Sequence, residues 1–258
     1  MSAAALAVDV SHGVATLTLD RPEKRNALNR ALVDELLAAI QDLEADAAVR
    51  VVALRGSGPD FCAGADLEDL ERITRMGEEE SLEDARALGA VLTGLRRLPK
   101  PVVAVVHGRA LAGGCGLATA CDVVLAHAQA ELGYPEVHLG FVPAMVMTIL
   151  RRKIGEAMAF DLVTRGHRIT ASEARAIGLV TRVLPAGDFD EGVARYLSEL
   201  AARPPSALAL IKRLLYELDD LSFEEGMERG ARVNVEARMT EACRDGVAAF
   251  LRRSRSGG

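Results

Sequence analysis

Short apolar runs alternate with helical segments along the first 185 residues, and this pattern leaves few folds open to the chain. Runs rich in β-branched residues, such as VATLTL from Val14 to Leu19, predict strands. Between the runs, apolar residues recur every three or four positions and predict helices with one apolar face. Strands that alternate with helices usually form a parallel sheet covered by helices, so the sequence predicts an α/β fold. The predicted strands are 14–19, 49–54, 102–106 and 122–126, and the predicted helices are 31–45, 67–76, 82–98 and a helix ending at 120.

The pattern changes after about Pro185, where the remaining residues predict helices only. We therefore expect two regions, a core of residues 1–190 and a C-terminal helical region of residues 191–258. A chain of 258 residues is long enough for one large core with such an appendage. Helices with few partners of their own often pack against other subunits, so we expect a homo-oligomer.

Charge and hydropathy argue against several classes of partner. The formal net charge is −6, and the segment LVDELLAAIQDLEAD is acidic, which disfavours a nucleic-acid-binding module. No apolar run approaches the roughly 18 residues of a membrane span, and residues 1–13 lack the charged and apolar regions of a secretion signal. The four cysteines form no CxxC pair, which is typical of reduced thiols. We expect a cytoplasmic protein with neither nucleic acid nor membrane as a partner.

Two glycine-rich stretches, DFCAGADLEDL at residues 60–70 and GRALAGGCG at residues 108–116, lie where a predicted strand ends and a helix begins. The first four backbone N–H groups of a helix have no partner within it, and glycine and alanine let a ligand approach them closely. Two such loops side by side would direct two N–H donors at one oxygen, the arrangement that stabilises an oxyanion. Close packing of strand against helix is the competing explanation for either loop taken alone.

Known phosphate-binding motifs do not account for the second stretch. Gly108 and Gly113 have P-loop spacing, but Gly114 and Cys115 stand where that motif has Lys and Ser or Thr. A third segment, LGYPEVHLGFVP at residues 132–143, contains a candidate catalytic carboxylate, Glu136, for which an ordinary surface glutamate is the alternative explanation.

Together, these segments resemble, in order, the motifs of the crotonase, or enoyl-CoA hydratase/isomerase, superfamily. LTLDRPEKRNALN resembles its N-terminal signature, FCAGADL and HGRALAGGCGLATACDV its two oxyanion-hole segments, AELGYPEVHLGFVP its catalytic-glutamate segment, and ITASEARAIGLVTRVLP the end of its core. The resemblance implies a spiral of ββα units with a C-terminal helical trimerisation region, often assembled as a hexamer of two trimers. It also implies an acyl-CoA substrate, no cofactor other than the coenzyme A of that substrate, and no metal.

The resemblance also assigns roles to individual residues. Ala65 and Gly113 match the two residues whose N–H groups hold the thioester oxygen, and Glu136 matches the catalytic carboxylate. The residues expected to contact the CoA or acyl part of the substrate, largely through the backbone, are Lys24, Arg25, Ala63, Gly64, Asp66, Leu67 and Gly114. His138 and Cys115 are close to these segments in sequence, and we expect structural roles for both.

One departure bears on the reaction. Many hydratases that this chain resembles carry a second glutamate directly after the GGC-type segment, where this chain has Gly116. Two carboxylates can hold a water molecule between them, but a single carboxylate can still act as a general base. The sequence predicts hydration of a 2-enoyl-CoA to a 3-hydroxyacyl-CoA, with isomerisation of a 3-enoyl-CoA by Glu136 alone as the alternative. A non-catalytic acyl-CoA-binding scaffold is the remote alternative. Met145 and Met147 stand where many relatives have small residues, and we expect them to reshape the acyl pocket or to pack in the core.

Overall fold

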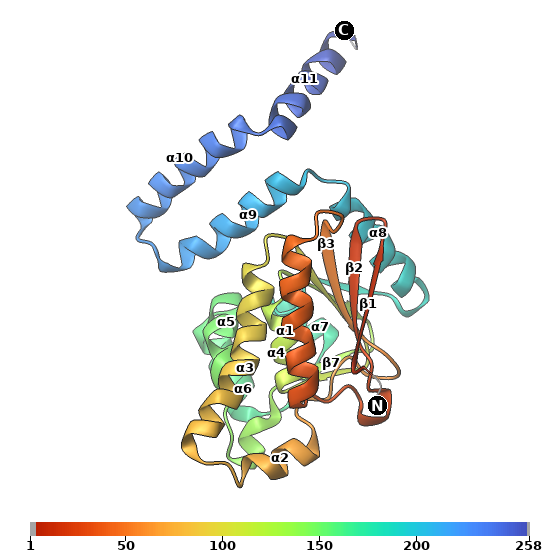
Figure 1. Ribbon diagram of the computed structural model, residues 1–258, viewed down its shortest axis with the longest axis vertical. Coiled ribbons are helices and arrows are strands. Elements are labelled where there is room, and N and C mark those ends of the chain that lie inside the picture. The colour runs from red at the N-terminus through yellow and green to blue at the C-terminus, as the bar shows by residue number, and fades with distance from the viewer. Residues whose placement is uncertain (1–3, 257–258) are drawn as a thin grey trace.

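The computed structural model describes residues 4–256 and confirms the predicted α/β class (Figure 1). Residues 1–3, part of the stretch compared above with a secretion signal, and residues 257–258 lie outside the described range. The strands are β1 Leu6–Ser11, β2 Val14–Leu19, β3 Val51–Gly56, β4 Val102–Val106, β5 Arg109–Leu111, β6 Val123–His127, β7 Glu131–Gly133, β8 Arg168–Thr170 and β9 Arg182–Leu184. They form a six-stranded sheet in the order β1-β2-β3-β4-β6-β9 and a three-stranded sheet in the order β5-β7-β8.

Strand pairing in the large sheet is parallel from β2 to β9, as predicted, and β1 pairs with β2 in the antiparallel direction. The helices are α1 Arg30–Ala45, α2 Leu67–Ile73, α3 Glu78–Arg97, α4 Gly113–Ala120, α5 Ala144–Ile154, α6 Glu156–Arg165, α7 Ala171–Ala176, α8 Phe189–Ala201, α9 Pro205–Glu217, α10 Phe223–Met239 and α11 Glu241–Ser256. A 3₁₀ helix, η2, spans Pro135–Leu139.

Helices cover both faces of the large sheet. Val52 and Leu54 of β3 belong to one buried cluster with residues of α1, α3 and α4, whereas Val51 and Ala53 belong to a second cluster with residues of α8. Figure 1 shows α1 and α3 side by side, on the opposite side of β1, β2 and β3 from α8. A strand that is buried on both faces needs apolar residues at every position, which explains the continuous run VVAVV in β4.

The structure corrects two parts of the sequence interpretation. The segment GEEES, which lies between the predicted helices 67–76 and 82–98, contains the Gly77 N-cap and the first turn of α3, so this helix begins four residues earlier than predicted. Glutamates are favoured there because the N-terminus of a helix carries a partial positive charge. Strand β1 and the three-residue strands β5, β7, β8 and β9 were not predicted, and a three-residue strand is too short to show a periodic pattern.

The C-terminal helices differ in how they meet the core. Helix α8, which begins at Phe189, packs on the sheet, although the boundary predicted near residue 190 placed it in the C-terminal region. Helix α9 is joined to the core where Lys212 Nζ lies 2.8 Å from a carboxylate oxygen of Asp122. Helices α10 and α11 extend away from the body of the molecule (Figure 1). The division into two regions stays a prediction, and the helices that stand apart are α10 and α11.

Within residues 4–256, no helix combines the length and the apolar character that a membrane crossing requires.

Candidate active site

The two glycine-rich loops lie in direct contact. Cys62 of the first loop forms a parallel bridge with Ala110 of β5. A Cβ added at Gly64, whose φ is +106°, would lie 3.0 Å from the Ala112 Cβ. A Cβ added at Gly114 would lie 2.4 Å from the Cys62 carbonyl oxygen, closer than real Cβ atoms come to other heavy atoms. Gly64 and Gly114, predicted as substrate-binding residues, therefore let the two loops pack closely against each other.

The backbone N–H of Ala65 points away from Leu28, the residue with which Ala65 is paired. Leu28 pairs with Ala65 in a parallel bridge, in which the Leu28 N–H donates to Gly64 O at 2.7 Å and the Leu28 carbonyl accepts from the Asp66 N–H at 2.8 Å. In this pattern the peptide groups of Ala65 itself face the opposite side. Among residues 4–256, no acceptor takes the Ala65 N–H.

The Gly113 N–H is free because Gly113 is the first residue of α4. The preceding residue, Ala112, has φ 48° and ψ −125°, a conformation that costs a residue with a side chain about 1–3 kcal/mol. Its N–H donates to Gly133 O at 2.9 Å, which holds the loop in place. The strained residue Ala112 directly precedes Gly113. The two predicted donors, the N–H groups of Ala65 and Gly113, therefore both lack an acceptor in the described chain and lie on two loops that are in contact.

Glu136 is brought to the same place by β7. Strand β7 pairs in parallel with β5, with Gly133 opposite Leu111, and Glu136 follows three residues later in η2. Its carboxyl group is partly buried, and Oε2 is buried without a hydrogen-bond partner in the described part of the chain. Burial raises the pKa of Glu136 above the ordinary value of a glutamate, against a smaller lowering by a backbone N–H. A carboxylate with an unpartnered oxygen is free to accept a proton from a bound molecule.

Gly116 occupies the position directly after the GGC-type segment, where a second catalytic glutamate was considered, so this position supplies no carboxylate. A Cβ added at Gly116 would lie 3.7 Å from Val146 of α5, which is ordinary van der Waals contact. Met145 and Met147 of the same helix pack against the main core, and Met145 lies 3.6 Å from the position that a Cβ on Gly89 of α3 would take.

Besides Gly64, five of the predicted CoA-contacting residues lie together around the first loop. The Ala63 N–H donates to Arg25 O at 3.0 Å, and Lys24 Nζ lies 2.9 Å from Glu68 at the beginning of α2. Leu67, the first residue of α2, is 80 % exposed although it is apolar. Asp66 precedes it and caps this helix by accepting from the Glu68 N–H at 3.1 Å.

Asp66 also forms a buried ion pair, at 2.7 Å, with Arg21. Burial alone would raise the pKa of Asp66, but the hydrogen bond from Arg21, the Glu68 N–H and the charge of Arg21 outweigh it and lower the pKa. The Asp66 carboxylate is therefore occupied within the protein. Its backbone N–H donates to Leu28 O and its carbonyl accepts from the Leu70 N–H, so the contact of Asp66 with CoA stays a prediction.

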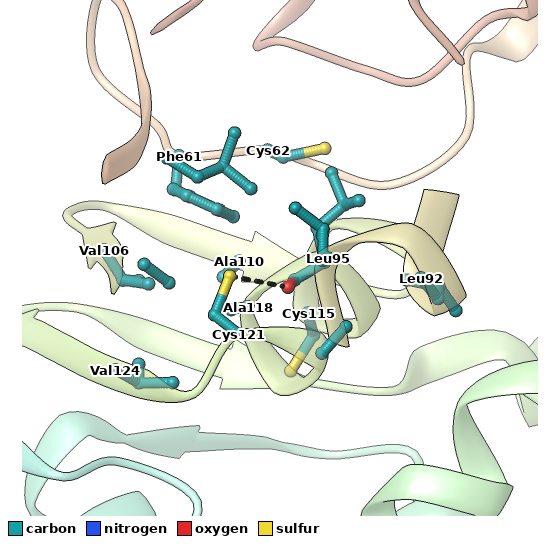
Figure 2. Packing of buried hydrophobic residues seen from close by; sticks show 14 of the residues in the cluster. Phe61, Cys62, Leu92, Leu95, Val106, Ala110, Cys115, Ala118, Cys121 and Val124 are labelled. Atoms are coloured by element: carbon teal, nitrogen blue, oxygen red, sulfur yellow. Dashed lines mark hydrogen bonds between the residues drawn. The ribbon is translucent and has the colours of Figure 1, made fainter. Parts of the chain in front are cut away.

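The remaining candidates have structural partners. His138 Nε2 lies 3.1 Å from Gly166 O, at the end of α6. Figure 2 shows Cys62, Cys115 and Cys121 within the apolar cluster, and Cys121 Sγ donates to Leu117 O at 3.3 Å. Burial raises the pKa of Cys62 to about 12 and that of Cys115 to about 11, so these thiols stay protonated and unreactive at neutral pH.

The sequence interpretation missed an ion pair that supports both loops. Asp60 is buried and accepts two hydrogen bonds, each 2.9 Å long, from the Arg109 guanidinium. Burial would raise the pKa of Asp60, but these hydrogen bonds and the charges of Arg109 and Arg25 lower it. The two residues are 49 positions apart, and no local pattern in the sequence connects them. Among residues 4–256, no group of three or more His, Cys, Asp or Glu side chains could hold a metal ion.

Comparisons with known proteins find similar proteins over nearly the whole chain. A family model described as enoyl-CoA hydratase/isomerase matches residues 9–256. A putative enoyl-CoA hydratase of Thermus thermophilus is 43% identical over 245 residues, which cover 95% of this chain and 97% of that protein. The 2,3-dehydroadipyl-CoA hydratase of Escherichia coli is 34% identical over 252 residues, 96% of each chain. The crystal structure of an enoyl-CoA hydratase from Mycobacterium smegmatis superimposes with a TM-score of 0.92 at 32% identity, and the match covers 96% of each chain.

Proposed function

This chain belongs to the enoyl-CoA hydratase/isomerase family, and we propose that it adds water to a 2-enoyl-CoA to give a 3-hydroxyacyl-CoA. One observation carries the proposal. Glu136, whose buried oxygen has no partner in the described chain, follows a strand that is held beside the loop of the free Gly113 N–H. A base and an oxyanion donor are the two groups that such an addition requires.

The proposed reaction uses two backbone donors and one carboxylate. The thioester oxygen accepts hydrogen bonds from the N–H groups of Ala65 and Gly113, which stabilise the enolate formed when the C2–C3 double bond is attacked. Glu136 takes one proton from water as the hydroxyl adds to C3, and the same proton is then delivered to C2. Since Gly116 offers no carboxylate, Glu136 serves both transfers, and the step needs no cofactor beyond the CoA of the substrate.

Mass spectrometry of the purified protein with a 2-enoyl-CoA and, separately, a 3-enoyl-CoA tests the reaction. We expect the 2-enoyl ester to gain the mass of one water. The esters tested should include 2,3-dehydroadipyl-CoA, because one relative is named as a hydratase of that compound. Conversion of the 3-enoyl to the 2-enoyl ester without water addition would establish the isomerase, which Gly116 favours. Recovery of both esters with neither a gain of water nor a shift of the double bond would favour the acyl-CoA-binding scaffold.

The pH dependence of the proposed reaction follows from Glu136. The carboxyl must be ionised to accept a proton, so kcat/KM should fall as the pH drops through the pKa of Glu136. Because burial raises that pKa, we expect the acid limb above the roughly 4.3 of an unperturbed glutamate. A profile of kcat/KM against pH with an acid limb at or below that value would contradict the assignment.

We further propose that the CoA part lies against the backbone around Arg25, Ala63 and Leu67. The exposed apolar side chain of Leu67 beside the exposed cation of Lys24 supports this placement, since CoA presents both an adenine ring and phosphates. The protein is proposed to act in the cytoplasm, which its free cysteines among the described residues support.

We also propose that the protein forms a homo-oligomer, either a trimer or a hexamer of two trimers. Exposed apolar side chains on the C-terminal helices support this proposal. Apolar side chains are exposed along α10 and α11, among them Phe223, Met227, Met239 and Phe250, each more than 60 % accessible. Such a surface is rare on a monomer and common at an interface. Light scattering should give a mass of at least three chains, and a monomer at micromolar concentration would refute this prediction.

A further inference from the structure

We propose that Tyr134 is a positioning residue, which fixes the turn carrying Glu136 against helix α4 through a buried hydrogen bond to Thr119. The inference rests on the proposed function, because it concerns where the base of that reaction is held.

The hydrogen bond joins two fully buried hydroxyl groups. Thr119 Oγ1 and Tyr134 Oη are 2.6 Å apart, and both residues are 0 % exposed. A hydroxyl group buried among apolar side chains is unfavourable unless it is paired, whereas phenylalanine would fill the same space without that requirement. The pairing, rather than the bulk of the ring, therefore distinguishes tyrosine at this position.

The bond connects the two halves of the candidate active site. Tyr134 is the N-cap residue of η2 and lies two positions before Glu136. Thr119 lies in α4, whose first residue, Gly113, presents the free N–H. This bond links the segment 134–139 to α4, and the same Tyr134 hydroxyl also interacts with the thiol of Cys115, another residue of that helix. A second bond of the segment, from His138 to Gly166, is directed instead to the end of α6.

The Glu136 side chain has little else to hold it. Its Oε2 has no hydrogen-bond partner within the described chain, so the position of the carboxylate depends on the backbone of the turn. Beyond Glu136 the segment is exposed, with Leu139 73 % and Val142 62 % accessible. Loss of the Tyr134 anchor would let the turn shift from α4 and admit water to the carboxylate. A displacement of about 1 Å can cost about 100-fold in rate.

Tyr134→Phe removes the hydroxyl and keeps the ring. We expect kcat for the enoyl-CoA to fall by about 10- to 100-fold while KM changes by less than about twofold, because the substrate contacts are untouched. We also expect the acid limb of the pH profile to move to lower pH, since burial is what raises the pKa of Glu136. Thr119→Val should reproduce both effects, and the double variant should be no slower than either single variant. Thr119→Ser, which keeps a hydroxyl, should restore most of the rate.

Tyr216→Phe is the matched control, because the Tyr216 hydroxyl also donates to a partly buried partner, Asp122, but joins α9 to the core. It should lower the melting temperature and leave kcat and the acid limb unchanged. The proposal is overturned if Tyr134→Phe and Thr119→Val keep kcat within about twofold and leave the acid limb in place. If Tyr134→Phe does not fold, the proposal is overturned when Thr119→Val and Thr119→Ser both react at the rate of the wild type. Failure of the wild type to add water would instead overturn the proposed function.

Discussion

Replacing Glu136 with glutamine is expected to lower kcat for hydration by about 10²- to 10⁴-fold, the range that one general acid–base group contributes. Glutamine keeps the shape of the side chain but can neither accept the proton of the attacking water nor return it to C2. Because Gly116 offers no second carboxylate, no neighbouring group at that position can take over. Steady-state kinetics with a 2-enoyl-CoA gives kcat, and titration with the product ester should give a Kd within about threefold of the wild type.

Glu131→Gln is the matched control for this prediction. Glu131 belongs to β7, in the same segment, and forms an exposed ion pair with Arg168 at 3.4 Å. Its substitution should leave kcat within about twofold. Glu136→Gln also removes a carboxylate whose ionisation is opposed by burial, so its melting temperature at neutral pH should be no lower than that of the wild type. Turnover of Glu136→Gln within tenfold of the wild type would remove Glu136 from the mechanism.

The sequence predicted those elements whose own residues determine them. Strands β2 and β4 have the predicted bounds because each is a run of β-forming residues long enough to show its pattern. Helix α1 begins within one residue of the predicted position 31, and the preceding Asn29 caps it by accepting from the Leu32 N–H at 3.0 Å. Strand β7, which delivers Glu136, was missed because its three residues become a strand only by pairing with β5 and β8.

In the candidate site, too, the features that depend on local sequence could be predicted and those that depend on distant segments could not. The N–H of Gly113 is free because this residue begins a helix, which the sequence could indicate. The motif resemblance indicated both Gly113 and Glu136. Their roles in turnover stay predictions. What the sequence could not indicate are contacts between distant segments, such as the hydrogen bond of Tyr134 to Thr119. The strain at Ala112 was equally hidden, since alanine rarely adopts a positive φ and nothing local requires it.

Replacing Gly114 with alanine is expected to lower kcat by about 10²- to 10³-fold, the cost of losing one oxyanion donor. The new Cβ would lie 2.4 Å from the Cys62 carbonyl oxygen and 2.7 Å from Cys62 Sγ, so α4 and the first loop must separate. Ala65 belongs to the loop that moves and Gly113 to the helix, and one oxygen can no longer accept from both N–H groups. Stopped-flow or steady-state kinetics with a 2-enoyl-CoA measures the loss.

Gly116→Ala separates this effect from the general consequences of a glycine substitution. It makes the same change on the same helix, but its Cβ would lie 3.7 Å from Val146, where it fits. Alanine is about 1 kcal/mol more favourable than glycine inside a helix, so Gly116→Ala should be at least as stable as the wild type and keep kcat within a few fold. Both variants are compared below the lower of their two melting temperatures. If Gly114→Ala folds and matches Gly116→Ala in kcat, the contact between the loops does not set the spacing of the two donors, and the oxyanion hole must be assigned to other N–H groups.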